Sequence, residues 1–143
     1  MADDIDLADY PLRTYDKIRY GDTDRQGHVN NAVFATFLES GRVEILYDAG
    51  DPLADPGCAF VIAQLVLNFR AEVKWPGSVE IGTRVASVGR SSIRMEQALF
   101  QDGRCVATAE TAIVQMDETT RRSSPLSARA VARLSALMPA TAR

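Results

Sequence analysis

The pattern of apolar and polar positions along the chain predicts five β-strands. The first, TYDKIRY at residues 14–20, alternates between two faces and contains β-branched and aromatic side chains. Four longer runs of this kind cover residues 58–69, 78–88, 91–101 and 104–116. The breaks between these four runs are short, and Asp102-Gly103 is a pair that favours a hairpin turn. We therefore expect the last four strands to form an antiparallel meander.

The run at residues 58–69 predicts one wholly apolar face. Strict alternation places the following residues on that face: Val61, Ala63, Leu65, Leu67 and Phe69. The opposite face mixes Phe60, Ile62 and Val66 with Gln64 and Asn68. We expect the apolar face to lie in the core, and the mixed face to meet solvent or a second sheet.

A helical period replaces the strand pattern between residues 31 and 49. Apolar or small residues recur there three or four positions apart, at Phe34, Phe37, Leu38, Gly41, Ile45 and Leu46. Asn30 or Asn31 suits the N-cap of this helix, and Gly50 suits its end. A shorter helix is predicted within residues 123–138, with Ser124 as its cap and Pro125 in its first turn.

These elements predict one α+β domain. The apolar stripe of the long helix must be buried, and the apolar side of the antiparallel sheet is the surface that can cover it. We therefore expect a curved sheet of about five strands around one long central helix, with a short C-terminal helix. In the 143-residue chain, residues 14–138 would form this domain, preceded by an acidic leader at 1–13 and followed by a tail at 139–143.

Composition narrows the choice of partner and compartment. Sixteen Lys and Arg against nineteen Asp and Glu give a net charge of -3, which argues against a nucleic-acid partner. No apolar stretch is long enough for a membrane span, and the acidic N-terminus is unlike a secretory signal, so we expect a cytoplasmic protein without a membrane partner. One histidine and two separated cysteines, Cys58 and Cys105, predict no metal site.

The loop GDTDRQGHVNN at residues 21–31 contains the candidate chemistry. It places Asp22, Asp24 and His28 just before the long helix, whose free N–H groups can stabilise a carbonyl oxygen that gains negative charge. A carboxylate beside such a site can act as general base or nucleophile on an acyl carbon. The same aspartates could instead satisfy loop amides, and Glu39 could form a solvated pair on the helix. Spacing alone leaves both interpretations open.

The loop and helix resemble the active-site signature of the hotdog-fold acyl-CoA thioesterases, in particular the 4-hydroxybenzoyl-CoA thioesterase-like family. That family has a pattern like (Tyr/Phe)-x-Asp-x-Asp-x-x-Gly-(His/Ile/Val)-Val, which reads YGDTDRQGHV at residues 20–29. The following AVFATFLESGRVEIL is similar to the helix of the family, and FRAEVKWPGSVEIG and the later strands also resemble it. The resemblance covers about residues 14–126 and implies the hotdog fold.

The resemblance implies roles for individual residues. Asp24 matches the catalytic carboxylate, and the backbone N–H of Asn31 matches the amide that polarises the thioester carbonyl. Loop or pocket support is implied for Asp22, Gly27, His28, Asn30 and Glu39. Arg25 replaces the small residue or proline that is frequent after the catalytic aspartate.

The resemblance also implies an acyl-CoA substrate and self-association. Coenzyme A enters as part of the substrate, so no separate cofactor is expected. By analogy its nucleotide arm would lie near Arg84, Arg90, Ser91, Ser92 and Arg94. Family members form dimers whose sites take residues from both chains, often as tetramers of two dimers.

Two other functions share this fold. Hotdog hydratases carry a pattern like Gly-Asp-x-Asn-Pro-x-His, but here Asp24 and Arg25 stand in place of Asn and Pro, and His28 is one residue too late. A non-catalytic protein that binds acyl-CoA or an acyl carrier is the second alternative, and the presence of Asp24 argues against it. The sequence therefore favours an acyl-CoA thioesterase.

Overall fold

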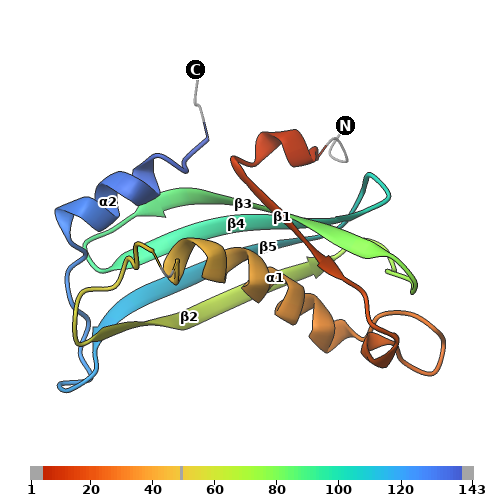
Figure 1. The fold of residues 1–143 in the computed structure, drawn as a ribbon, viewed down its shortest axis with the longest axis horizontal. Coiled ribbons are helices and arrows are strands. Elements are labelled where there is room, and N and C mark those ends of the chain that lie inside the picture. The colour runs from red at the N-terminus through yellow and green to blue at the C-terminus, as the bar shows by residue number, and fades with distance from the viewer. Residues whose placement is uncertain (1–4, 49, 140–143) are drawn as a thin grey trace.

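The computed structural model describes residues 5–48 and 50–139, and these form an antiparallel sheet against one long helix. In chain order the elements are η1 (Leu7–Asp9), β1 (Leu12–Lys17), η2 (Tyr20–Asp22), α1 (Asn31–Leu46), β2 (Cys58–Phe69), β3 (Ser78–Val88), β4 (Ser92–Gln101), β5 (Arg104–Asp117) and α2 (Ala128–Ser135). The strand order is β1-β3-β4-β5-β2, so β1 and β2 are the two edges. Figure 1 shows the sheet curving around α1. The predicted α+β fold and its long helix are confirmed. The predicted four-strand meander is wrong in one strand: β3, β4 and β5 form a meander, but β2 pairs with β5 at the far edge and not with β3, because the chain crosses the sheet between β2 and β3.

The N-terminal segment packs on the face of the sheet opposite α1. β1 begins at Leu12, two residues earlier than predicted, and ends at Lys17. Before it, the buried Tyr10 lies with its ring edge against Phe100 and beneath the Arg84 guanidinium, 4.7 Å from the ring centre. Residues 5–10 therefore cover part of the outer face of β3 and β4. Residues 1–4 of the expected leader and 140–143 of the expected tail lie outside the described residues.

A β-bulge in β2 overturns the predicted division of its two faces. The pairing with β5 shifts register between Ile62 and Gln64. Ile62 lies opposite the buried Ile113, and Leu65 lies opposite the buried Thr111, so both side chains point to the helix side of the sheet. Strict alternation had placed Phe60 and Ile62 on the other face from Leu65. That prediction is wrong, because the bulge adds one residue and reverses the alternation beyond it.

Helix α1 lies close against the sheet at Gly41. All six residues of its predicted stripe are buried. A Cβ at Gly41 would lie 2.8 Å from each of three side-chain atoms: Ile81 Cγ2, Thr83 Oγ1 and Gln97 Nε2. Glycine is therefore the residue that permits this helix-to-sheet spacing.

A buried polar group accompanies this close contact. Gln97 Nε2 donates to the Leu38 carbonyl oxygen (2.9 Å) and to Thr83 Oγ1 (3.0 Å), and Gln97 Oε1 accepts from Arg42 Nη1 (3.3 Å). Burial lowers the pKa of the Arg42 guanidinium, while the charge of Glu39 one turn earlier opposes that shift. These bonds fix the rotation and height of α1 on the sheet, because buried polar groups must be paired.

The C-terminal helix begins later than predicted. Ser127, not Ser124, caps α2, with its Oγ accepting from the Ala130 backbone N–H at 3.0 Å. Ser124 and Pro125 instead run beside β5, where both bond to Gln115. None of the helices in the described part of the chain is long and apolar enough to cross a bilayer.

We expect Gly41→Ala to destabilise the protein by roughly 1–3 kcal/mol, because the added methyl group must displace packed atoms of β3 and β4. Gly21→Ala is the matched control, since a Cβ there meets nothing within 4 Å. Urea denaturation of the two variants and the wild type measures the difference. Equal midpoints for Gly41→Ala and the wild type would contradict the close contact.

Candidate active site

The loop that precedes α1 is held in place by Asp22. This carboxylate is buried, and its Oδ2 accepts from the backbone N–H of Arg19 at 2.9 Å, while Oδ1 lies 3.3 Å from Arg19 Nη2. The backbone carbonyl oxygen of Asp22 accepts from the Asn30 backbone N–H at 2.8 Å. Asp22 thus joins the end of β1 to the start of α1, and both of its side-chain oxygens interact with Arg19.

Asp24 is exposed and closes a tight turn. Its Oδ1 accepts from the backbone N–H groups of Gln26 (2.8 Å) and His28 (3.2 Å). Its own N–H donates to the His28 carbonyl oxygen (2.8 Å), and Gly27, at φ +81°, provides the left-handed residue of the turn. Among the described residues no hydrogen bond involves Oδ2 of Asp24, so this oxygen is available for chemistry.

The start of α1 presents an unused donor beside this turn. The Asn30 side chain caps the helix by accepting from the Ala32 N–H at 2.9 Å, so the prediction that Asn30 or Asn31 caps the helix is confirmed with Asn30. Within the described part of the chain the Asn31 backbone N–H has no acceptor. It lies in the first turn of a 16-residue helix, where the helix dipole favours negative charge.

A cavity of about 440 Å³ brings Asp24 and Asn31 together. Its lining combines polar loop residues with apolar ones from α1 and from the end of β2: Asp24, Gln26, His28, Val29, Asn31, Phe34, Phe69, Arg70, Ala71 and Glu72. Phe34 and Phe69 pack edge to face, with ring centres 5.0 Å apart. A substrate in this cavity would therefore meet a carboxylate, a helix N-terminus and an aromatic wall.

The residues that follow β2 form the second wall of this cavity. The Val29 N–H donates to the Val73 carbonyl oxygen at 2.7 Å, which ties the loop to this wall. His28 Nδ1 lies 3.1 Å from Glu72 Oε2. Sequence reasoning missed Phe69, Arg70 and Glu72 as site residues. The only available signal was the change from apolar to charged residues where β2 ends, and it does not reveal that this end meets the loop.

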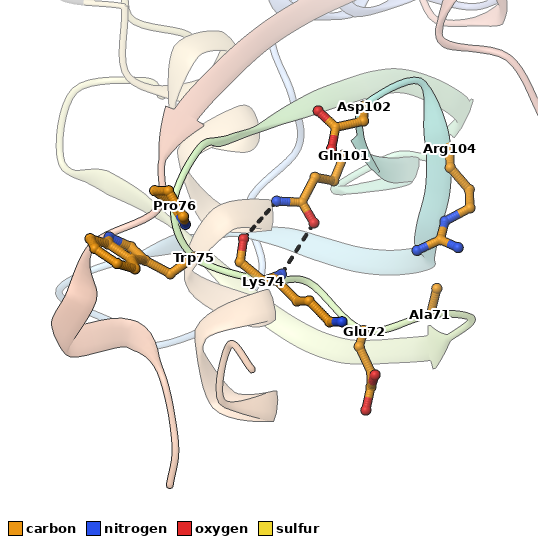
Figure 2. Close-up of a pocket in the computed structure, with 8 residues that line it drawn as sticks. All are labelled: Ala71, Glu72, Lys74, Trp75, Pro76, Gln101, Asp102 and Arg104. Atoms are coloured by element: carbon orange, nitrogen blue, oxygen red, sulfur yellow. Dashed lines mark hydrogen bonds between the residues drawn. The ribbon is translucent and has the colours of Figure 1, made fainter. Parts of the chain in front are cut away.

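A second hollow of about 600 Å³ adjoins the first, since Ala71 and Glu72 line both. In Figure 2 the Gln101 side-chain amide bonds to both backbone groups of Lys74, at 2.8 and 3.2 Å. The charged side chains around it are Glu72, Lys74, Asp102 and Arg104. Two cations and two carboxylates give this hollow no single sign of charge, so we do not assign it as a binding site for a phosphate group of the substrate.

Glu39 lies apart from the cavity. It is exposed on α1, two turns beyond Asn31, and is not part of the cavity lining. Its charge acts on the buried Arg42 one turn later. The geometry therefore relates Glu39 to the packing of α1 on the sheet.

The residues expected for coenzyme A do not meet Asp24 within one protomer. Arg84 lies on the outer face of the sheet, where its Nε donates to Glu96 at 2.8 Å, and Arg94 shares that face. Arg90 and Ser91 lie in the turn between β3 and β4, and Ser92 is the first residue of β4. The other end of β3, at Ser78, pairs with Lys17 beside the Asp24 loop, so the turn lies at the opposite end of the sheet.

No cluster of three or more potential metal ligands of the His, Cys, Asp or Glu type occurs in residues 5–48 and 50–139.

Comparison with known proteins shows which family the chain resembles over most of its length. The profile of the family described as "Thioesterase-like superfamily" matches residues 18–134. The chain is similar to the acyl-acyl carrier protein thioesterase ATL2 of Arabidopsis thaliana, at 30% identity over 88 residues, covering 59% of this chain and 47% of ATL2. This chain therefore spans about half the length of that relative.

Two bacterial proteins match over more of their length. Acyl-CoA thioester hydrolase YbgC of Escherichia coli is 27% identical over 115 residues, which is 78% of this chain and 83% of YbgC. The crystal structure of a thioesterase from Thermus thermophilus, complexed with coenzyme A and Zn, superimposes with a TM-score of 0.78 at 30% identity, covering 90% of this chain and 95% of that one.

We expect Asn30→Ala to destabilise the protein by about 1 kcal/mol, because the Ala32 N–H loses its acceptor. Asn30→Ser is the control, since serine also caps helices well. Denaturation gives the stability, and amide hydrogen exchange at residues 31–33 reports the local effect. Unchanged exchange in Asn30→Ala would show that the cap does not hold the helix start.

Proposed function

Because this chain belongs to the Thioesterase-like superfamily, we propose that it hydrolyses an acyl-CoA thioester to a free acid and coenzyme A. The observation that carries this proposal is the shared cavity of Asp24 and the Asn31 backbone N–H. Asp24 supplies an ionisable oxygen, and the Asn31 N–H supplies a hydrogen-bond donor for the carbonyl oxygen of the substrate. The similarity to YbgC and to the Thermus thermophilus thioesterase supports coenzyme A as the carrier.

The geometry of Asp24 fits a reacting carboxylate. Two backbone N–H groups hold Oδ1, so the carboxylate is oriented, and Oδ2 remains for the substrate. From there Oδ2 can attack the carbonyl carbon or take a proton from an attacking water. In both routes negative charge develops on the carbonyl oxygen, where a donor at a helix start is most effective.

The exposed helix-side residues of β2 support the second part of the proposal, a dimer. Ile62 is 49% exposed, Leu65 37% and Phe69 50%, although all three point to the side of the sheet that α1 covers elsewhere. Their strand is an edge with unpaired backbone groups. We propose that β2 pairs with β2 of a second copy, and that two such dimers associate through the outer faces of their sheets.

This pairing also provides a place for coenzyme A. If the two β2 strands run antiparallel, the Phe69 end of β2 in one copy lies beside the Cys58 end of β2 in the other copy. The residues Arg90, Ser91 and Ser92 lie at the Cys58 end of the sheet. Each site would then combine Asp24 and Asn31 of one copy with the turn of the other, whose arginine suits phosphate.

We expect Asp24→Asn to lower thiol release from the acyl-CoA that the wild type cleaves best by about 10²–10⁴-fold. The variant keeps an acceptor for the Gln26 and His28 N–H groups but loses the ionised oxygen. Thiol release is followed with a thiol-reactive dye across aromatic and straight-chain acyl-CoAs.

Asp6→Asn is the matched control, since the exposed Asp6 carboxylate also accepts from a backbone N–H, that of Ala8 at 3.0 Å, and lies in the N-terminal segment outside the cavity lining. Turnover in Asp24→Asn equal to that of the wild type would exclude the mechanism. Tight acyl-CoA binding without thiol release would identify a binding protein, and loss of enoyl absorbance would identify a hydratase.

We expect Ile62→Lys to convert the dimer into a monomer and to abolish thiol release, because a charge would be buried at the β2 pairing. Tyr15→Lys on the opposite edge strand is the control, since Tyr15 is also exposed. Light scattering after size exclusion measures the mass. A dimer that survives Ile62→Lys with full affinity would place the interface elsewhere.

A further inference from the structure

The cavity that holds Asp24 also holds a carboxylate–imidazole pair. His28 is the single histidine of the chain, and its side chain is 25% exposed. Its Nδ1 lies 3.1 Å from Oε2 of Glu72, which comes from the opposite wall. Since Glu72 occupies the side of Nδ1, Nε2 is the ring nitrogen that remains for a ligand.

His28 also brings an imidazole into this lining, the side chain that most often serves as a general acid. An arginine does not release its proton in proteins, and an ionised carboxylate only accepts hydrogen bonds. Asp24 is assigned to the carbonyl side of the reaction. An imidazole, in contrast, exchanges protons readily between pH 5 and 8, and in its protonated form both nitrogens are donors.

Thioester cleavage has a second proton requirement that Asp24 does not meet. When the C–S bond breaks, its electron pair remains on sulfur, and an alkyl thiolate is a base that departs more easily with a proton. We propose that His28 donates this proton and that Glu72 is its positioning residue. The proposal rests on the function proposed above and adds to it the group that serves the leaving sulfur.

In the proposed step one bond forms at the carbonyl carbon and one bond breaks. The carbonyl carbon gains a bond to oxygen, either from Asp24 or from a water that Asp24 deprotonates. The C–S bond breaks, and the proton on Nε2 of the His28 imidazolium moves to the sulfur. When water attacks, the products are the free acid, a neutral thiol, protonated Asp24 and a neutral imidazole, and solvent carries the proton from Asp24 back to the imidazole. When Asp24 itself attacks, the first products are the neutral thiol, the neutral imidazole and an acyl anhydride on Asp24, which water then hydrolyses to the free acid.

Glu72 acts through His28 and does not touch the reacting atoms. Its side chain is 62% exposed, so the pair contributes little to stability. The loop is already tied to this wall by the bond between Val29 and Val73. The contribution of Glu72 is therefore directional: it holds the ring with Nε2 turned away from the carboxylate.

The test compares two thioesters of the same acyl group that differ only in the leaving thiol. The acyl group is the one that the wild type cleaves best from coenzyme A. One substrate releases N-acetylcysteamine, an alkyl thiol, and the other releases 4-nitrothiophenol, whose thiolate departs without a proton. The full chain is used, with the variants His28→Asn, Glu72→Gln and Glu72→Ala.

We expect His28→Asn to lower kcat about 100-fold on the N-acetylcysteamine thioester and less than about 3-fold on the nitrophenyl thioester. Glu72→Ala should show the same selectivity with a smaller loss, and Glu72→Gln a smaller loss still. In the His28→Asn background, Glu72→Ala should add nothing, because the two residues act as one unit. Glu110→Gln, an exposed glutamate of β5 outside this cavity, is the control with wild-type rates.

Equal losses on both thioesters would overturn the assignment, because a residue that only shapes the cavity does not distinguish the leaving groups. The role of Glu72 as the positioning residue of His28 would also be excluded if Glu72→Ala lowered kcat as much in the His28→Asn background as in the wild type. Wild-type protein that cleaves neither thioester nor any acyl-CoA would overturn the proposed function and this assignment together. Selective losses at His28 with full activity in Asp24→Asn would retain the proton donor and reject the role of Asp24.

Discussion

The contact between α1 and the sheet at Gly41 determines where the site can form. The helix approaches β3 and β4 so closely that no side chain fits at this position, and Gln97 bonds to the Leu38 carbonyl oxygen directly beside it. A helix fixed in height and rotation has a fixed N-terminus. Because Asn31 is that N-terminus, the contact three turns away sets the place of its free N–H group.

The site itself is built largely from backbone hydrogen bonds. Asp22 joins the end of β1 to the helix start, and Asp24 is held by the N–H groups of Gln26 and His28. Such bonds orient a carboxylate without neutralising it, whereas a cationic partner would compete with the substrate. An exposed loop can in this way carry a well-oriented reactive group on a rigid support.

The sequence predicts the elements whose signals are local. The stripe from Phe34 to Leu46, the cap at Asn30 and the hairpin at Asp102-Gly103 each depend on neighbouring residues, and all three are confirmed. The bulge after Ile62 is not visible in the pattern, because apolar residues occupy both faces of that edge strand. Glu72 is missed for a different reason. Its importance comes from a contact with His28 across 44 positions of the chain, and one sequence contains no record of such contacts.

The bulge and the position of the coenzyme A candidates both support the proposed dimer. By reversing the alternation, the bulge places Ile62 on the helix side together with Leu65, so the apolar surface of β2 extends beyond what α1 covers. A monomer would leave that surface in water and would keep the turn at Arg90 a full sheet length from Asp24. A two-fold axis at β2 removes both difficulties at once, because antiparallel pairing buries the surface and exchanges the two ends of the sheet. In the proposed dimer, this edge strand would therefore complete the site.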